Sequence, residues 1–190
     1  MSDNIDIFNM FQNFPKQENI VTTRLVLRPM TIEDAPSIHR LVNDEDIAYG
    51  CVHIPYPYPE GAAEAWISGH YYRFMQQSAA IFAITKDEAI IGATAIELKF
   101  DERRYYIGYW IGKEFWGNGY ASEAARGLID YGFNNLEIPV LFAECLEENT
   151  SSLNVLQKIG MKEIARISKP CHSPTKEEPV VVFQIERNDQ

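Results

Sequence analysis

The sequence lacks the usual signs of a disulfide framework, a metal centre or a membrane anchor. Its three cysteines, Cys51, Cys145 and Cys171, are an odd number, lie far apart and form no Cys-x-x-Cys pair, so we expect reduced thiols. The four histidines show no metal-ligand spacing with each other or with the cysteines, and we expect no metal site. No apolar run approaches the length of a membrane span, and the N-terminus has no basic region followed by an apolar segment. These absences predict a cytoplasmic protein.

Positive charge is also scarce. The 190 residues include 17 Lys and Arg against 27 Asp and Glu, which gives a formal net charge of −10. A chain this acidic argues against nucleic acid or an anionic membrane as its main partner, and it is compatible with a cationic substrate such as an amine. The apolar fraction of 46% and charged fraction of 23% are typical of a globular protein. We expect a single domain over residues 20–190, large enough for a full core, after an N-terminal extension of residues 1–19.

The N-terminal extension contains one pattern. Phe8, Phe11 and Phe14 recur every third residue before Pro15. That spacing fits a helical turn packed on the domain or on a partner, and a disordered tail fits it equally well.

Apolar periodicity divides the rest of the chain into strands and helices. Strands are expected over residues 23–28, 79–85, 89–98, 104–111, 140–146, 161–168 and 180–186, and helices after Thr31, after residues 54–59, over residues 121–134 and over residues 149–159. The order β-α-α-β-β-β-α-β-α-β-β predicts an α/β (α+β) fold, a mixed sheet of about seven strands with about four helices on both faces. The proline-rich residues 169–179 are expected to form a mobile loop.

The prolines of residues 54–59 (IPYPYP) exclude regular structure there, because alternating prolines remove backbone donors and fix φ. Tyr56 and Tyr58 of this segment either shape an amine pocket or pack a rigid loop.

One stretch, residues 111–124 (IGKEFWGNGYASEA), joins a strand to a helix through a loop that contains Gly117 and Gly119. Backbone N–H groups at a helix start lack intrahelical partners and lie at the positive end of the helix dipole, so this arrangement can bind a phosphate. Ser122 occupies the place of the third glycine of a dinucleotide motif, and no Gly-Lys-Ser/Thr follows as in a Walker A loop. A simple turn into a helix is the alternative.

This loop resembles the pyrophosphate loop of the GNAT superfamily of acetyl-CoA-dependent N-acyltransferases, whose pattern is Q/R-x-x-G-x-G/A. The longer string WGNGYASEA and the opening T-x-R-L-x-L-R-P of residues 22–29 resemble the branch of ribosomal-protein N-terminal acetyltransferases (RimJ/RimL-like). The resemblance covers residues 22–186. Glu114 departs from it, because the superfamily usually has Gln or Arg there; the departure affects one side-chain contact and leaves the backbone cradle intact.

The resemblance implies a splayed sheet, in which acetyl-CoA lies in the V between two neighbouring strands. It implies that acetyl-CoA is the cosubstrate and that no metal takes part. The residues that it places at acetyl-CoA are Trp110, Ile111, Gly112, Gly117, Asn118, Gly119, Tyr120, Ala121, Ser122, Asn149 and Ser152. In the family geometry the backbone N–H of Ile111 donates to the thioester oxygen, and Asn149 bonds the pantetheine arm.

Transfer of acetyl from a thioester to an amine needs a group that takes the amine proton. Glu144 is the first candidate, since it shares a strand face with Val140, Phe142 and Leu146 and we expect such surroundings to raise its pKa. It also precedes the helix-start asparagine by five residues, the spacing of the catalytic glutamate in ribosomal-protein alanine acetyltransferases. The alternative is an edge glutamate that faces water. Glu97 is the second candidate.

The leaving thiolate benefits from a proton donor. Many GNAT enzymes use a tyrosine seven residues after the helix-start asparagine, and here that position is Leu156. The N-x-x-S of the resembled branch places Ser152 toward the sulfur instead, where it acts as an acid or orients a water or the thiol. A helix-capping role is the alternative for Ser152.

The resulting prediction is an acetyl-CoA-dependent N-acetyltransferase that works by direct transfer in a ternary complex, as a monomer or homodimer. Its acceptor is a protein N-terminal amine or a small amine such as a polyamine or aminoglycoside. A non-catalytic acyl-CoA-binding sensor or scaffold is the competing interpretation, which the missing tyrosine leaves open.

Overall fold

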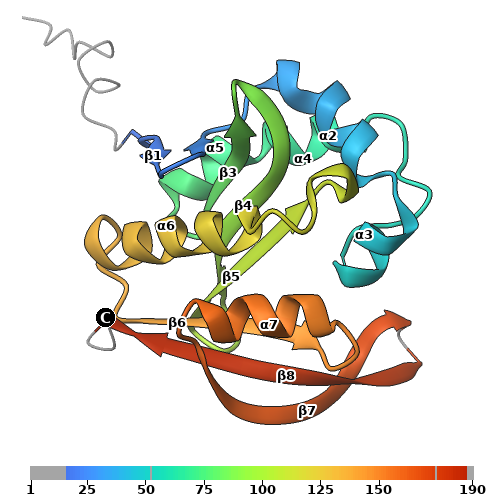
Figure 1. Ribbon diagram of the computed structural model, residues 1–190, viewed down its shortest axis with the longest axis vertical. Helices are drawn as coiled ribbons and strands as arrows, with labels where there is room; N and C mark the ends of the chain where they lie inside the picture. The colour runs from blue at the N-terminus through green and yellow to red at the C-terminus, as the bar shows by residue number, and fades with distance from the viewer. Residues whose placement is uncertain (1–15, 52, 174, 188–190) are drawn as a thin grey trace, which may run out of the picture.

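One eight-stranded sheet organises the part of the chain that the structure, a computed structural model, describes: residues 16–51, 53–173 and 175–187 (Figure 1). The strands are β1 (Ile20–Val21), β2 (Val26–Arg28), β3 (Ala79–Lys86), β4 (Ala89–Lys99), β5 (Arg104–Ile111), β6 (Val140–Leu146), β7 (Lys162–Ser173) and β8 (Lys176–Glu186). Their order across the sheet is β1-β2-β3-β4-β5-β6-β8-β7. Neighbouring strands are antiparallel except β5 and β6, which are parallel. The expected turn or tail at Phe8, Phe11 and Phe14 lies outside the described residues.

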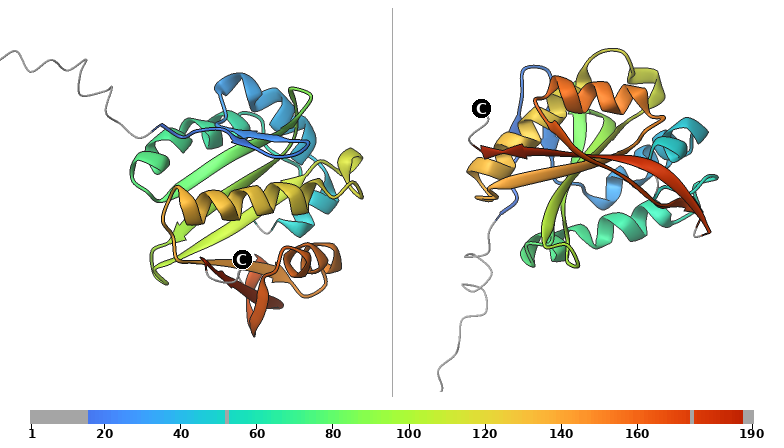
Figure 2. Two further views of the ribbon diagram at one scale, coloured as in Figure 1. Left: turned by 60° about the vertical axis from the view of Figure 1, so that its left-hand side comes forward. Right: turned by 90° about the horizontal axis from the view of Figure 1, so that it is seen from below.

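Helices cover both faces of this sheet (Figure 2). They are α2 (Ala35–Val42), α3 (Glu45–Gly50), α4 (Ala62–Ser68), α5 (His70–Met75), α6 (Tyr120–Asn134) and α7 (Thr150–Lys158). The core on one face is built from α6 and α7, and a second apolar cluster joins α2 and α4 to the other face. The predicted mixed α/β fold with helices on both faces is therefore confirmed. In the described residues no helix combines the length and apolarity that crossing a membrane requires.

The parallel pair β5 and β6 stays together only at one end. Its register is limited to Tyr105 opposite Leu141 and Tyr106 opposite Phe142. Beyond Tyr106 the two strands diverge, as their ribbons show in Figure 1. This gap is the splay that we expected, and it leaves the polar backbone groups on one side of β5 without a strand neighbour.

Three predicted segments differ from the structure. The first strand, expected over residues 23–28, is limited to β2, and the short strand β1, which was not predicted, precedes it. The helical segment after the prolines is divided at Gly69 into α4 and α5, and α3 is a helix that apolar periodicity did not predict. The expected mobile loop at residues 169–179 is wrong, because β7 and β8 stay paired as far as Ser173 opposite Lys176. Prolines are tolerated here for a structural reason. Pro170 lies in the edge strand β7, and Pro179 lies just beyond the ladder that β8 forms with β6.

Candidate active site

The N-terminus of α6 lies beside the gap between β5 and β6. Its N-cap is Gly119, with φ +77° and ψ 8°, and no side chain caps the helix there. Gly117 also has φ +77°. Only glycine adopts this left-handed conformation without strain, which explains both glycines of the loop. The first-turn N–H groups of Tyr120, Ala121 and Ser122 have no carbonyl four residues earlier within the helix, so they remain available to an anion.

Side chains hold the loop before α6 in place through its carbonyl oxygens. The indole N–H of Trp116 donates to the carbonyl of Ile111 at 2.6 Å. The amide of Asn118 donates to the carbonyls of Phe115 and Trp116 at 3.1 and 3.0 Å. The guanidinium of Arg24 donates to the carbonyl of Asn118 at 3.0 Å. The carbonyl oxygens of the loop therefore hold it in place. The N–H groups of Phe115 and Trp116 donate to the carbonyls of Gly112 and Lys113, and those of residues 117–119 are left for a ligand.

Glu123 ties the first turn of α6 to the start of the sheet. One carboxylate oxygen accepts from the Thr22 hydroxyl at 2.7 Å and from the Arg24 backbone N–H at 2.6 Å, and the other accepts from Arg24 Nε at 2.7 Å. Burial opposes ionisation, but these donors together lower the pKa of Glu123. Glu114, the residue that departs from the family pattern, pairs with Arg40 of α2 at 3.0 Å on the surface.

The backbone N–H of Ile111 points into the gap between β5 and β6. In an antiparallel ladder successive residues direct their N–H groups to opposite sides. Gly112 donates to the carbonyl of Ile91 on β4 at 2.8 Å, so the preceding residue, Ile111, must face away from β4. The bond from Trp116 to the Ile111 carbonyl lies on that same side. This N–H is thus positioned as expected for a donor to a carbonyl oxygen in the gap.

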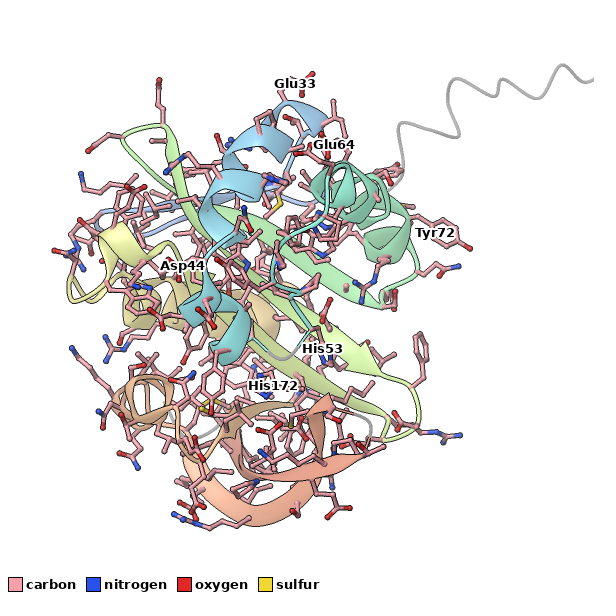
Figure 3. The ribbon with its side chains drawn as sticks, turned by 90° about the vertical axis from the view of Figure 1, so that its right-hand side faces the viewer. Glu33, Asp44, His53, Glu64, Tyr72 and His172 are labelled. Atoms are coloured by element: carbon pink, nitrogen blue, oxygen red, sulfur yellow. The ribbon has the colours of Figure 1, made fainter. Side chains whose placement is uncertain are left out.

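A cavity of about 640 Å³ lies on the other side of the gap. Its walls come from the helices α2, α4 and α7, the strands β4, β5, β6 and β7, and the segment between α3 and α4. They include Ile38, Val42, Ile54, Tyr58, Trp66 and Trp110. His53 also lines it, and Figure 3 labels His53 near α3 and His172 on β7. The alternative in which Tyr58 shapes a pocket is therefore consistent with the structure, and Tyr56 is exposed.

One contact joins α3 to the far side of the cavity mouth. The ring of Tyr49 stacks on His172, with ring centroids 5.0 Å apart and planes 5° from parallel. The Tyr49 hydroxyl donates to Glu148 at 2.7 Å, and a ring nitrogen of His172 lies 2.9 Å from the Tyr49 carbonyl oxygen. These contacts connect α3 to β7 and to the segment between β6 and α7.

Glu144 lies in the cavity wall, but its environment is not the apolar one that the strand pattern predicted. Lys99 donates to its Oε2 at 2.7 Å, and Lys169 donates to the same oxygen. Burial alone would raise the pKa of Glu144, whereas Lys169 and Lys99 favour the carboxylate and the net effect lowers the pKa. The expected raised pKa is therefore wrong, because two lysines from β4 and β7 reach a residue of β6.

Glu97, the second candidate, also lines the cavity. It lies in β4 and has one cationic partner, Arg73 of α5, whose guanidinium donates to Oε1 at 2.8 Å. Its side chain is 46% exposed, so water reaches its carboxylate. His53 is a further titratable group at the cavity that the sequence did not single out.

Asn149 and Ser152 lie at the start of α7, and Ser152 lines the cavity. The Asn149 side chain accepts from the backbone N–H of Ser152 at 3.1 Å and therefore caps the helix. The N-cap of α7 is therefore Asn149, and the Ser152 hydroxyl is not needed for capping. The Ser152 hydroxyl instead lies 3.0 Å from the phenol oxygen of Tyr109, a residue of β5. Leu156, at the position of the family tyrosine, is 1% exposed.

The residues expected at acetyl-CoA form three adjacent groups: Trp110–Gly112 at the end of β5, the glycine loop with the first turn of α6, and Asn149 with Ser152 at the start of α7. The buried side chain of Ser122 leaves only its backbone for a ligand. Sequence reasoning missed Tyr109 and Trp116. Tyr109 alternates with Ile107 and Ile111 on one strand face, which was a visible signal, but the helix that it meets was not predictable from that pattern.

Comparison with known proteins identifies one domain family. A family model described as an acetyltransferase (GNAT) domain matches residues 24–162. The uncharacterized N-acetyltransferase p20 of Bacillus licheniformis is 30% identical over 148 residues, which cover 77% of this chain and 83% of that protein. The spermidine N(1)-acetyltransferase of Escherichia coli K12 is 29% identical over 136 residues, 70% of each chain.

Solved structures share the fold at lower identity. A GNAT-family acetyltransferase from Bacillus anthracis superposes with a TM-score of 0.78 at 23% identity, covering 90% of this chain and 99% of that one. RimL, a ribosomal L7/L12 α-N-protein acetyltransferase in complex with coenzyme A, superposes with a TM-score of 0.80 at 18% identity, covering 91% and 100%. At these identities the likeness supports the fold, and the ribosomal-protein branch is not distinguished from the rest of the family.

Proposed function

The chain belongs to the acetyltransferase (GNAT) domain family, and we propose that it transfers acetyl from acetyl-CoA directly to one primary amine in a ternary complex. Enzymes of this family are acyltransferases that use acetyl-CoA as cosubstrate, and this chain is one of them. One observation carries the proposal of direct transfer. Tyr109 and Trp110 of β5 and Ala143 of β6 line the cavity, so the cavity meets the gap between the strands where a thioester would end.

The groups around the gap suggest how acetyl-CoA would be held. The free N–H groups at the α6 start and the loop with Gly117 and Gly119 would bind the pyrophosphate. The pantetheine arm would follow β5 toward Asn149, whose amide oxygen is used by the cap and whose Nδ2 is the remaining donor. The N–H of Ile111 would donate to the thioester oxygen as it gains negative charge. We take residues 20–190 as the single domain that does this.

Proton removal from the amine is assigned to Glu97, with Glu144 in a supporting role. A general base works best when its pKa is close to the working pH. The two lysines that lower the pKa of Glu144 make it a weaker base, and they leave it as an anchor for Lys99 and Lys169. Among the residues that the structure describes, Glu97 pairs with Arg73, and it lies half-exposed in the cavity, where a water can relay the proton.

The cavity favours an amine attached to an apolar group. Its side walls include Ile38, Val42, Ile54 and Trp66, which suit an apolar side chain. The carboxylates that line it, Glu97 and Glu144, are both engaged by cations of the protein. A polyamine would need unpaired carboxylates for its second charge. We therefore infer that the acceptor is a peptide N-terminus or a small monoamine, in contrast to spermidine.

The test is an acceptor panel. Peptides with free N-termini, apolar monoamines and spermidine are each incubated with acetyl-CoA, and acetylated products are measured by mass spectrometry. We expect kcat/KM for the best peptide or monoamine to exceed that for spermidine by at least about tenfold, 1.4 kcal/mol in transition-state binding. A preference for spermidine would contradict the assignment of the acceptor. Tight acetyl-CoA binding without any acetylated product would support the sensor alternative, to which the comparisons lend no support.

The compartment we propose is the cytoplasm. All three cysteines are free thiols, and all three, Cys51, Cys145 and Cys171, line the cavity. Burial raises the pKa of Cys145, and burial followed by the nearby Cys145 raises the pKa of Cys51 to about 12. Such thiols suit a reducing environment.

A further inference from the structure

Tyr109 brings a phenol to the start of α7 from a different element of the fold. It lies in β5, on the strand face shared with the buried residues Ile107 and Ile111. Its oxygen lies 3.0 Å from the Ser152 hydroxyl oxygen and 3.4 Å from the Ser152 carbonyl oxygen. Both Tyr109 and Ser152 line the cavity. A tyrosine is thus present near the expected sulfur position, although Leu156 replaces the tyrosine of the helix.

The direction of the bond between the two hydroxyls follows from their chemistry. A phenol, with an ordinary pKa of about 10, is more acidic than an aliphatic alcohol and is the better donor. Burial raises the pKa of Tyr109. The hydrogen bond with Ser152 lowers it by less, so the net pKa is raised. The phenol therefore keeps its proton at neutral pH. The Ser152 hydroxyl is nearer than the Ser152 carbonyl, so Tyr109 donates to the hydroxyl oxygen.

This bond determines where the serine hydrogen can point. A serine hydroxyl has one hydrogen and two lone pairs. When Tyr109 donates to one lone pair, the hydrogen stays free for an acceptor in the gap, and the donated bond polarises it. The thiol of Cys145 directs its own hydrogen at the carbonyls of Leu146 and Asn149, at 3.3 and 3.6 Å, and its sulfur can accept a hydrogen bond from Ser152. The sulfur of acetyl-CoA would replace the Cys145 sulfur as the acceptor of the Ser152 hydrogen.

We propose that Tyr109 is a positioning residue that aims the Ser152 hydroxyl at the sulfur of acetyl-CoA. The inference rests on the proposed function. In the step, the amine nitrogen bonds to the acetyl carbon, the carbon–sulfur bond breaks and its electron pair passes to the sulfur. The Ser152 hydroxyl stabilises that thiolate by a hydrogen bond. The proton lost by the amine passes through water and Glu97, and the coenzyme A thiolate takes a proton from solvent.

The first test reads the sulfur environment without an acceptor. Coenzyme A is bound to the protein and its thiol is titrated by the ultraviolet absorbance of the thiolate. In the wild type we expect a thiol pKa below the free value of about 8.5. Tyr109→Phe and Ser152→Ala should each raise it, and the double variant should match Ser152→Ala alone, because Tyr109 acts through the serine. Tyr105→Phe is the matched control: it removes a phenol of the same strand face that bonds the Gln77 carbonyl at 3.1 Å.

Kinetics supply the second readout. With the acceptor found by the panel, Tyr109→Phe should lower kcat about tenfold and change KM for acetyl-CoA by less than about twofold. Two results would overturn the inference: a Tyr109→Phe thiol titration equal to the wild type, or an equal further shift when Tyr109→Phe is added to Ser152→Ala. The titration distinguishes this failure from failure of the proposed function, which would appear as a wild-type enzyme that acetylates no amine.

Discussion

The ammonium of Lys99 lies 2.7 Å from Oε2 of Glu144, and Lys169 reaches the same oxygen from β7. Two cations on one carboxylate keep Glu144 ionised at any pH near neutrality. This relationship is the reason for proposing Glu97 rather than Glu144 as the proton acceptor, and it gives a direct comparison between two isosteric substitutions.

Glu97→Gln should lower kcat roughly a hundredfold, the usual effect of losing a general base. Glu144→Gln should lower it less than about tenfold and destabilise the fold, because Lys99 and Lys169 lose their shared anion. Steady-state kinetics with acetyl-CoA saturating measures both, and thermal melts separate folding from chemistry. If Glu144→Gln abolishes turnover while Glu97→Gln does not, the roles are reversed.

The second prediction concerns the phosphate cradle. Gly119→Ala should weaken acetyl-CoA binding at least tenfold, about 1.4 kcal/mol, because a left-handed φ strains alanine and displaces the N–H groups of the α6 start. Isothermal calorimetry measures the affinity.

Gly61→Ala is the matched control for Gly119→Ala. Gly61 is the N-cap of α4 and has φ +74°, and an added Cβ meets no atom within 4 Å. Both variants should lose a similar amount of thermal stability, but only Gly119→Ala should lose affinity. If the two folded variants bind acetyl-CoA with equal affinity, the phosphate site does not lie at the N-terminus of α6.

A buried histidine makes the third prediction, on stability and pH. His70 is 6% exposed, neither ring nitrogen has a hydrogen-bond partner among the described residues, and its ring lies edge-on to Trp66 at 4.5 Å. Burial, and then the charge of Arg73, lower its pKa from 6.5 to about 4. At a pH between these two pKa values, His70 is protonated in the unfolded chain and neutral in the folded chain. Stability must therefore fall as the pH drops from 6.5 toward 4.

His70→Phe should remove that part of the pH dependence. The wild type should lose up to about 3 kcal/mol relative to His70→Phe over this range, an upper limit from the size of the shift. Urea unfolding of both proteins at neutral and at mildly acid pH measures the difference. The same pH slope in both proteins would show that His70 is protonated in the folded state.

The fourth prediction concerns Leu156, whose side chain is buried and also lines the cavity. Leu156→Tyr should cost about 1–3 kcal/mol of stability, because the larger ring overpacks the contact between α7 and the sheet. In a Ser152→Ala background it should recover part of the rate by supplying a phenol near the sulfur. Leu156→Phe, which adds the ring without the hydroxyl, should show the same stability loss and no recovery. Recovery by phenylalanine would mean that packing, and not a proton donor, limits the rate.

The features that the sequence predicted correctly are local ones. The alternation of residues 104–111, the loop glycines and the apolar spacing after Ala121 specify a strand, a turn and a helix within about thirty residues, and the structure has β5, the loop and α6 there. The start of α6 without a side-chain cap follows from Gly119 itself. Such features depend on neighbouring residues, so their physics is contained in a short window.

The features that sequence reasoning missed join distant segments. Lys99 and Lys169 lie 45 and 25 residues from Glu144, and their charges reverse the pKa shift that the strand pattern predicted. Tyr109 and Ser152 are 43 residues apart and meet only because β5 and α7 flank the same gap. Electrostatics and hydrogen bonds of this kind depend on tertiary packing, which periodicity does not encode.

Direct transfer in a ternary complex is the central claim, and the cysteines of the cavity define its alternative, a covalent acetyl-cysteine. Cys145 lies in the cavity wall, but burial raises its pKa and its thiol is directed at backbone carbonyls. The most direct measurement is the initial rate of coenzyme A release with acetyl-CoA and the amine both varied. The account predicts acceptor-dependent release and double-reciprocal lines that intersect. Parallel lines, with burst release of coenzyme A before the amine is added, would contradict it.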